Sequence, residues 1–382
     1  MKIAVSLMAG IVLAWYFVIP FALFPLLLVV VLLAFCLWRY EHLQSAVIGL
    51  CFVVLGALLM QRALQEPSSV SRLDRSKTYF LAQRAKLLDR LSESGVDGSV
   101  YAVVAAMTLG DKSQLTKELR DIYAVSGASH ILALSGLHLG IIYTLLSLLL
   151  SRRRWQVISQ VVIIVCIWQF VFLVGMSASV VRSAVMITVY ALLSLGHRDK
   201  MSVNTLAFAA IVMLLFNPKS LFDVGFQLSF MAVLAILLFC PMLERLIPLH
   251  VQMEHRWLKA LWGLTCVSLA AQIGTAPLIA YYFGRFATWF LLSNFVVIPL
   301  ATMLLYLALL SIATFWWSGL QALLVAALSA IVVFMNYLLE GITQLPFCSM
   351  EGIHLSTLQL GCIYLLIGSG YVLLSLRYPR SR

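Results

Sequence analysis

Charged residues are scarce in this sequence. Of its 382 residues, 11% are Asp, Glu, Lys or Arg, whereas 63% are hydrophobic. A typical soluble globular protein is about half apolar and about a quarter charged. The composition therefore excludes an ordinary soluble fold and indicates an integral membrane protein.

Motifs of several enzyme classes are also missing. The sequence has no GxGxxG fingerprint, no phosphate-binding loop and no HExxH or HxHxDH metal motif. The seven cysteines are scattered without a CxxC pair, so we interpret them as small hydrophobic residues. We therefore expect no nucleotide, no metal and no other cofactor.

Acidic residues are fewer than basic ones. The 15 acidic and 26 basic residues give a net charge of +11. In a membrane protein, such an excess usually reflects anchoring of cytoplasmic loops. It also suits anionic lipid or nucleic acid, so charge alone does not decide between these partners.

Long apolar runs, in contrast, are abundant. Because a membrane span needs about 20 apolar residues, twelve segments are candidates: 3–19, 21–38, 45–61, 129–150, 156–176, 178–195, 201–216, 225–243, 257–279, 287–310, 320–340 and 357–376. We predict an all-α, polytopic transmembrane helical bundle of about 10–12 spans, with short amphipathic or re-entrant helices near 77–150. The first run is predicted to be a span rather than a removed signal peptide, because no small-residue cleavage site followed by a soluble body is evident.

The distribution of basic residues predicts the orientation. If the N-terminus is cytoplasmic, the inside loops hold most of the arginines, including the run 152–154, and the later outside loops hold only Lys219 and Arg285. We expect a multi-pass protein of the inner (plasma) membrane with both termini in the cytoplasm. The basic region 62–120 would then lie outside, against the rule, so its side and the exact number of spans stay open.

Residues 62–97 form the only long polar stretch. Helical spacing over 77–92 predicts an amphipathic helix at the membrane surface, with a nucleic-acid contact as the alternative. A short apolar helix should follow from residue 98, then Gly110-Asp111-Lys112, then a charged helix over 113–124. Both helices are too short to span a membrane.

The stretch from Ser126 to Gly140 carries two histidines, together with serines and glycines, at the front of an apolar run. His130 and His138 would share a broad face of an unbroken helix, but Ser135-Gly136 could break it. Polar groups in hydrocarbon are costly unless protein or water satisfies them. We therefore predict a partly polar element that lines a conduit, with purely structural histidines as the alternative.

Three further polar clusters lie among apolar residues. Arg182 stands early in a span, where it either faces protein or extends to the headgroups. Gln227, four residues after Asp223, either joins helices or lines a pathway. In the last cluster, a break in the span at 272–277 is expected, followed by the aromatic residues 281–283, which would either form an interfacial belt or stack on bases, and by Arg285 and Asn294.

These blocks, in this order, resemble the competence domain of the ComEC family, membrane channels for DNA uptake in natural transformation. The resemblance covers about residues 98–310 and rests on the following positions: Gly110-Asp111, the SGxxHxxALSGLH pattern of 126–138, Arg182 with Met186, Gly196, Arg198, Asn217-Pro218, GFQLSF at 225–230, Tyr282-Phe283-Gly284, Asn294 and Pro299. We expect four parts: N-terminal transmembrane helices in 1–61, a polar amphipathic segment in 62–97, a channel core in 98–310 and C-terminal transmembrane helices in 311–382.

The resemblance also implies partners. Full-length members of the family resemble a three-part design with an OB-like domain and a metallo-β-lactamase-like nuclease module. Residues 62–97 are too few for the first, and only a basic tail follows residue 376. We therefore expect separate DNA-binding, nuclease and motor proteins as partners, beside single-stranded DNA and membrane lipids. A homo-oligomer is left open.

The predicted function is translocation of single-stranded DNA across the inner membrane, without catalysis. The candidate channel or gating residues are Asp111, His130, Ser135, His138, Arg182, Gln227, Arg285 and Asn294. Two other functions remain as alternatives. The first is an intramembrane hydrolase that uses Ser135 and His138 as nucleophile and base. The second is a transporter of another anionic polymer or lipid intermediate.

Overall fold

The computed structural model describes residues 1–17, 29–31, 40–65, 73–93, 95–96, 98–150, 156–195, 202–247, 255–314 and 316–377. The chain divides into two compact units, each described here by itself. One contains Met1–Arg72 and Val185–Phe230, and the other contains Leu73–Ala184 and Met231–Arg382. The boundaries fall inside the helices α10 (Ala178–Ser194) and α12 (Val224–Glu244).

The predicted all-α, polytopic bundle is confirmed. Among the described residues, seven helices are long and apolar enough to cross a membrane: α3 (Glu41–Gln65), α9 (Gln156–Leu173), α12, α14 (Arg256–Phe283), α15 (Phe290–Ala313), α16 (Ser318–Thr343) and α17 (Thr357–Arg377). Five shorter apolar helices accompany them: α1 (Lys2–Tyr16), α5 (Gly98–Leu109), α8 (Gly136–Leu150), α10 and α11 (Val203–Phe216). The chain is thus a multi-pass membrane protein; of the twelve candidate segments, 21–38 lies mostly outside the described residues.

Small residues hold the first unit together. A Cβ added at Gly10 of α1 would overlap the backbone of Val53 in α3, and one at Gly56 would overlap the backbone of Leu7. Such contact between backbones is how small residues pack helices in a membrane. A buried cluster that includes Leu7, Met60 and residues of α11 extends this packing.

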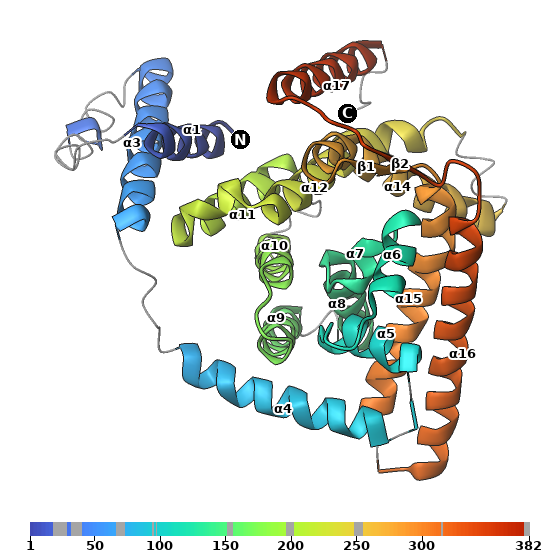
Figure 1. The fold of residues 1–382 in the computed structure, drawn as a ribbon. Coiled ribbons are helices and arrows are strands. Elements are labelled where there is room, and N and C mark those ends of the chain that lie inside the picture. The colour runs from blue at the N-terminus through green and yellow to red at the C-terminus, as the bar shows by residue number, and fades with distance from the viewer. Residues whose placement is uncertain are drawn as a thin grey trace. The chain divides into compact units, whose positions relative to one another are not determined.

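A buried short helix lies at the centre of the second unit. Residues 102–109 of α5 are all buried, so this helix is covered on every side, as expected for a helix that is apolar all round. Its partners include α15 and α16, which run side by side (Figure 1). The prediction of a short apolar helix here is confirmed.

The polar elements around α5 also match the sequence, with shifted bounds. The amphipathic helix is α4 (Leu73–Glu93), and its ribbon runs roughly across the direction of α15 and α16 (Figure 1). The charged helix is α6 (Lys117–Val125), which begins later than predicted because Thr116 caps it by accepting a hydrogen bond from the Leu119 N–H at 3.2 Å.

The predicted break in the stretch 129–150 is confirmed as well. It divides into α7 (Ser129–Leu132) and α8, with Ala133 in an extended conformation between them. Residues 217–222 end α11 as expected, because the 3-10 helix η2 (Pro218–Phe222) follows directly.

The expected break of a span at 272–277 is wrong, because α14 continues through Pro277. Proline removes one backbone donor from a helix, but neighbouring groups satisfy the polar atoms around it. The Thr275 hydroxyl donates to the Ala271 carbonyl at 2.9 Å, and the Tyr364 hydroxyl of α17 donates to the Gly274 carbonyl at 2.8 Å. Membrane helices tolerate proline when other groups supply hydrogen bonds in this way.

Two short strands complete the second unit. Strand β1 (Arg285–Ala287) pairs antiparallel with β2 (Ser349–Glu351), so that Arg285 stands opposite Glu351. The left-handed conformation of Gly284 (φ 64°) ends α14 and turns the chain into β1.

Candidate functional site

The break between α7 and α8 brings Ser135 and His138 together. The Ser135 N–H donates to His138 Nδ1 at 3.3 Å, and the Ser135 hydroxyl oxygen lies 3.1 Å from the same nitrogen. A side chain three residues into a helix that returns to the backbone N–H of the capping residue is the arrangement of a capping box. His138, which is 1% exposed, therefore stabilises the start of α8.

This geometry bears on the proton positions of the His138 ring. Because Nδ1 accepts the Ser135 N–H, the neutral ring carries its proton on Nε2. The His138 Nε2 is buried and has no hydrogen-bond partner among the described residues. A serine nucleophile needs a ring nitrogen that is free to take its proton, whereas Nδ1 already receives a backbone donor.

His130 lies on the other side of the break. Its Nδ1 is 3.2 Å from the Gly127 carbonyl oxygen, and its side chain is exposed. Gly127 has a φ of 83°, and a Cβ there would lie 2.9 Å from the Cβ of Ala287 in β1. The two histidines belong to different helices, His130 to α7 and His138 to α8, and the loop before α7 packs against the short sheet at Gly127.

The Asp111 loop and helix α10 both pack against the break. A Cβ at Gly110 would lie 2.7 Å from Leu134 Cδ1, so the loop that holds Asp111 packs directly on the residue before Ser135. On another side, a Cβ at Gly136 would lie 2.9 Å from the hydroxyl oxygen of Ser183 in α10. A side chain at either place would displace its neighbour, and at Gly110 the positive φ of 72° also favours glycine.

Arg182 is placed next to this contact. It precedes Ser183 on α10 and is only 6% exposed, so its side chain is buried in protein. A buried arginine on an apolar helix is costly and usually marks a functional position. Of the two readings of Arg182, burial favours the inward-facing cation over extension to the headgroups.

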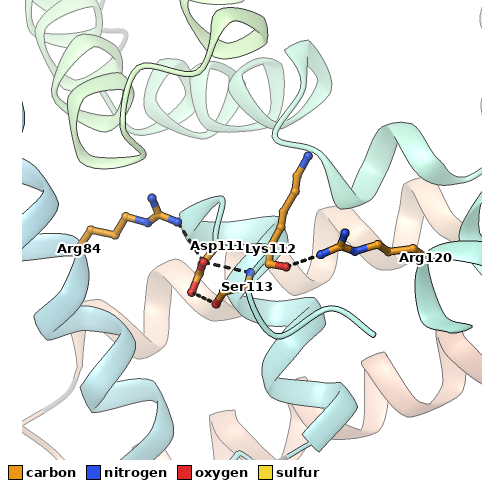
Figure 2. A network of polar contacts seen from close by, with 5 residues as sticks. All are labelled: Arg84, Asp111, Lys112, Ser113 and Arg120. Carbon is orange, nitrogen blue, oxygen red and sulfur yellow. Dashed lines mark hydrogen bonds and ion pairs between the residues drawn. The ribbon is translucent and has the colours of Figure 1, made fainter. Parts of the chain in front are cut away.

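An ion pair joins the Asp111 loop to α4. Arg84 Nη2 lies 3.6 Å from Asp111 Oδ1, and Asp111 also accepts the Ser113 N–H at 3.2 Å and the Ser113 hydroxyl at 3.0 Å (Figure 2). Arg120 of α6 donates to the Lys112 carbonyl at 2.8 Å. The loop is thus held from both sides by arginines.

Arg84 is not among the site residues predicted from the sequence. The signal was present, because Arg84 follows Phe80 by one helical turn and Phe80 is on the apolar side of α4. That side packs on protein, since the rings of Phe80 and Phe172 of α9 stack with centroids 5.4 Å apart. A cation on the packed side of an amphipathic helix needs an anionic partner.

The remaining candidates lie elsewhere. Asn294 donates to the Ser268 hydroxyl oxygen at 3.2 Å and so ties α15 to α14, while Arg285 is exposed in β1. Gln227 belongs to the first unit, where it donates to the Leu221 carbonyl at 3.1 Å. Asp223 accepts the Phe226 N–H at 2.8 Å and caps α12.

The histidines, cysteines and carboxylates do not form a metal site in the part of the chain that the structure describes, where no three of them cluster. In the second unit, the arrangement around the break can hold a buried positive charge, a buried imidazole and two polar loops in an otherwise apolar bundle. Polar and charged groups held in this way inside an apolar bundle are costly and usually mark a functional position.

Comparisons with known proteins bear on this arrangement. A family model described as "Competence protein" matches residues 107–377. ComE operon protein 3 of Bacillus subtilis is 32% identical over 205 residues, which is 52% of this chain and 24% of the relative. An uncharacterized protein of Aquifex aeolicus is 33% identical over 197 residues (51% and 44%), and the uncharacterized protein YcaI of Escherichia coli is 25% identical over 217 residues (53% and 27%).

The matches cover less than half the length of each of these relatives. No solved structure matches this chain. The matched family region contains the helix break, Arg182 and the Asp111 loop.

Proposed function

Because this chain belongs to the competence protein family, we propose that it forms, or contributes to, a channel that moves single-stranded DNA across the inner membrane during natural transformation. The family match extends over most of the second unit, including both sides of the α7–α8 break. The alignment to ComE operon protein 3 over 205 residues adds support from a named relative.

The single observation that carries the proposal is the buried Arg182 beside the broken helix. A nucleic-acid strand carries one negative charge per phosphate, and a path through hydrocarbon must offset the lost hydration of these charges. A few fixed cations attract phosphates and still release them, whereas many would trap the strand. One buried arginine in an apolar surrounding suits conduction better than storage.

The path would be independent of DNA sequence. Passage of any strand requires contacts to the backbone and stacking on base faces rather than hydrogen bonds to base edges. We assign the channel core to 98–310, preceded in the chain by transmembrane helices in 1–61 and followed by those in 311–382, with cytoplasmic termini. Separate DNA-binding, nuclease and motor proteins would capture, process and pull the strand.

The test is a transformation assay in the organism that encodes this chain, with the gene deleted and then restored in variant form. Arg182→Gln should lower transformation by at least tenfold while labelled duplex DNA still binds the cell surface. Arg182→Lys should restore part of the activity, since it keeps the charge. Lys259→Gln, which removes an exposed cation from α14 of the same unit, serves as the matched control.

The outcome that refutes the proposal is normal transformation in the deletion strain. It would favour the transporter of another anionic polymer or lipid intermediate. Normal transformation with Arg182→Gln, at wild-type protein level, would instead remove Arg182 from the path.

The second candidate function, an intramembrane hydrolase, rests on one distance: the Ser135 hydroxyl lies 3.1 Å from His138 Nδ1, the nitrogen that also accepts the Ser135 N–H. The two candidates make opposite predictions for Ser135→Ala. An enzyme would lose its activity completely. A channel would lose only the contact between the Ser135 hydroxyl and His138, because alanine keeps the backbone N–H that His138 caps, and should keep most of its transformation activity. Ser135→Thr, which keeps the hydroxyl, is the control.

A further inference from the structure

A groove with a volume of about 500 Å³ lies in the second unit between α4, α8, α9 and α15. Its walls are mainly apolar, with Leu146 of α8, Cys166 of α9 and Leu309 of α15 among them. Tyr79 and Gln83 of α4 form one side. The volume falls within the range of roughly 300–1,000 Å³ of small-molecule sites.

The position of this groove relates it to the membrane surface. Helix α4 is amphipathic and runs roughly across α15 and α16, as a helix lying in the membrane interface would (Figure 1). On α9, the groove extends from Cys166 to Leu173, the last residue of the helix. At 1.5 Å per residue, it therefore reaches about 10 Å inward from the end of α9.

Two of the side chains that line the groove are polar amides. Gln83 and Gln169 both line it, and neither amide has a hydrogen-bond partner among the described residues. Gln169 is exposed on an apolar helix that is long enough to span a membrane. An amide in that position is costly unless a polar group approaches it.

Lys86 provides a cation on α4 near one of these two amides, that of Gln83. Lys86 follows Gln83 by three residues, which places both on one side of α4. Lys86 is exposed and forms no ion pair in the described part of the chain, in contrast to Arg84, which contacts Asp111. The groove thus combines mainly apolar walls with the amides of Gln83 and Gln169, and the exposed Lys86 lies about one helical turn from Gln83 on α4.

From the apolar walls, the two amides and the nearby cation we propose that the groove is a binding site for a phospholipid with an anionic headgroup. An acyl chain would fill the space between α8, α9 and α15. The amides of Gln83 and Gln169 would donate to ester or phosphate oxygens, and Lys86 would contact the headgroup. A second copy of this chain fits less well, since two copies that each carry a net charge of +11 repel each other.

The test uses the full chain reconstituted in vesicles that contain phosphatidylglycerol or phosphatidylcholine with a photoactivatable group at the end of one acyl chain. After irradiation, mass spectrometry identifies the labelled peptides. We expect phosphatidylglycerol to label the α8 and α9 peptides that contain Leu146 and Cys166. Lys86→Gln should lower this labelling about fivefold, as for the loss of one cation at an anionic lipid surface, and should leave the phosphatidylcholine signal unchanged.

Two matched controls separate the site from general contact with lipid. Leu146→Trp fills the groove and should reduce labelling by both lipids, whereas Leu149→Trp, on an exposed position of the same helix, should not. Lys259→Gln should behave as the unchanged protein. Equal labelling by the two lipids together with no effect of Lys86→Gln overturns the proposal. So does unchanged labelling of Leu146→Trp, or a cross-link between two protein chains through Cys166.

Discussion

The clearest prediction concerns Gly110, where the Asp111 loop meets the helix break. Gly110→Ala introduces two separate costs. Its φ of 72° is disfavoured for any residue with a Cβ by about 1–2 kcal/mol. In addition, the new Cβ would lie 2.7 Å from Cδ1 of Leu134, a buried side chain that is 5% exposed. Such overpacking typically costs about 1–3 kcal/mol.

Gly95→Ala provides the matched control. Gly95 also has a positive φ, of 84°, but a Cβ there meets nothing within 4 Å. Its substitution should therefore cost only the backbone part, about 1–2 kcal/mol. The difference between the two variants, about 1–3 kcal/mol, measures the contact between the loop and the break.

Thermal unfolding in detergent can measure this difference with a dye that fluoresces on reaction with cysteine. Cys240, Cys266 and Cys348 are buried, so they react only when the protein opens. If each kcal/mol moves the midpoint by about 2 °C, Gly110→Ala should melt about 2–6 °C below Gly95→Ala. Shortening the neighbour with Leu134→Val should recover part of this loss. Equal midpoints for the two alanine variants, or no recovery, would refute the proposed contact.

Three other contacts give further predictions. A double-mutant cycle of Arg84→Met and Asp111→Asn should show a coupling of about 0.5–1 kcal/mol in the same assay, which weakens at high salt; strictly additive effects would contradict the ion pair. Asn294→Leu should destabilise by less than about 2 kcal/mol, because hydrogen bonds between membrane helices average about 0.6 kcal/mol, and Ser268→Ala should have a similar effect. Gly10→Val should separate α1 from α3, because the new Cβ would overlap the backbone of Val53 in α3. We expect this variant to aggregate on size-exclusion chromatography. A monodisperse, stable variant would count against this packing.

Helices were predictable from the sequence because run length and apolar composition determine them in a membrane. The break between α7 and α8 was predictable for a local reason too, since Ser135-Gly136 lies in the middle of the apolar run and the His138 side chain, three residues on, accepts the Ser135 N–H. The expected break near Pro277 was wrong because its outcome depends on distant groups. The hydroxyl of Tyr364, which belongs to another helix, donates a hydrogen bond to the Gly274 carbonyl. The sequence around Pro277 does not predict that contact.

In the candidate site too, contacts between sequence neighbours were predictable and contacts between distant residues were not. The capping of α12 by Asp223 follows from neighbouring residues. The pairing of Arg84 with Asp111 does not, because it depends on how α4 packs against α9 and α5. Sequence reasoning selected Asp111 as a polar residue in an unusual loop, but it could not select its partner among the many cations of 62–97.

Burial divides the candidate residues into two groups. Asp111, Gln227 and Asn294 all make hydrogen bonds within the protein, and these contacts explain their presence without any cargo. Arg182 and His138 differ from these in burial and not in bonding, because each carries polar nitrogen deep inside an apolar unit, at 6% and 1% exposure. Capping of α8 occupies only Nδ1 of His138 and leaves Nε2 directed away from Ser135. If the helix break serves a strand of phosphates, loss of the Arg182 charge should impair transport more than it lowers stability. Loss of His138 should also weaken the start of α8, which it caps, and loss of the first group should lower stability and transport together.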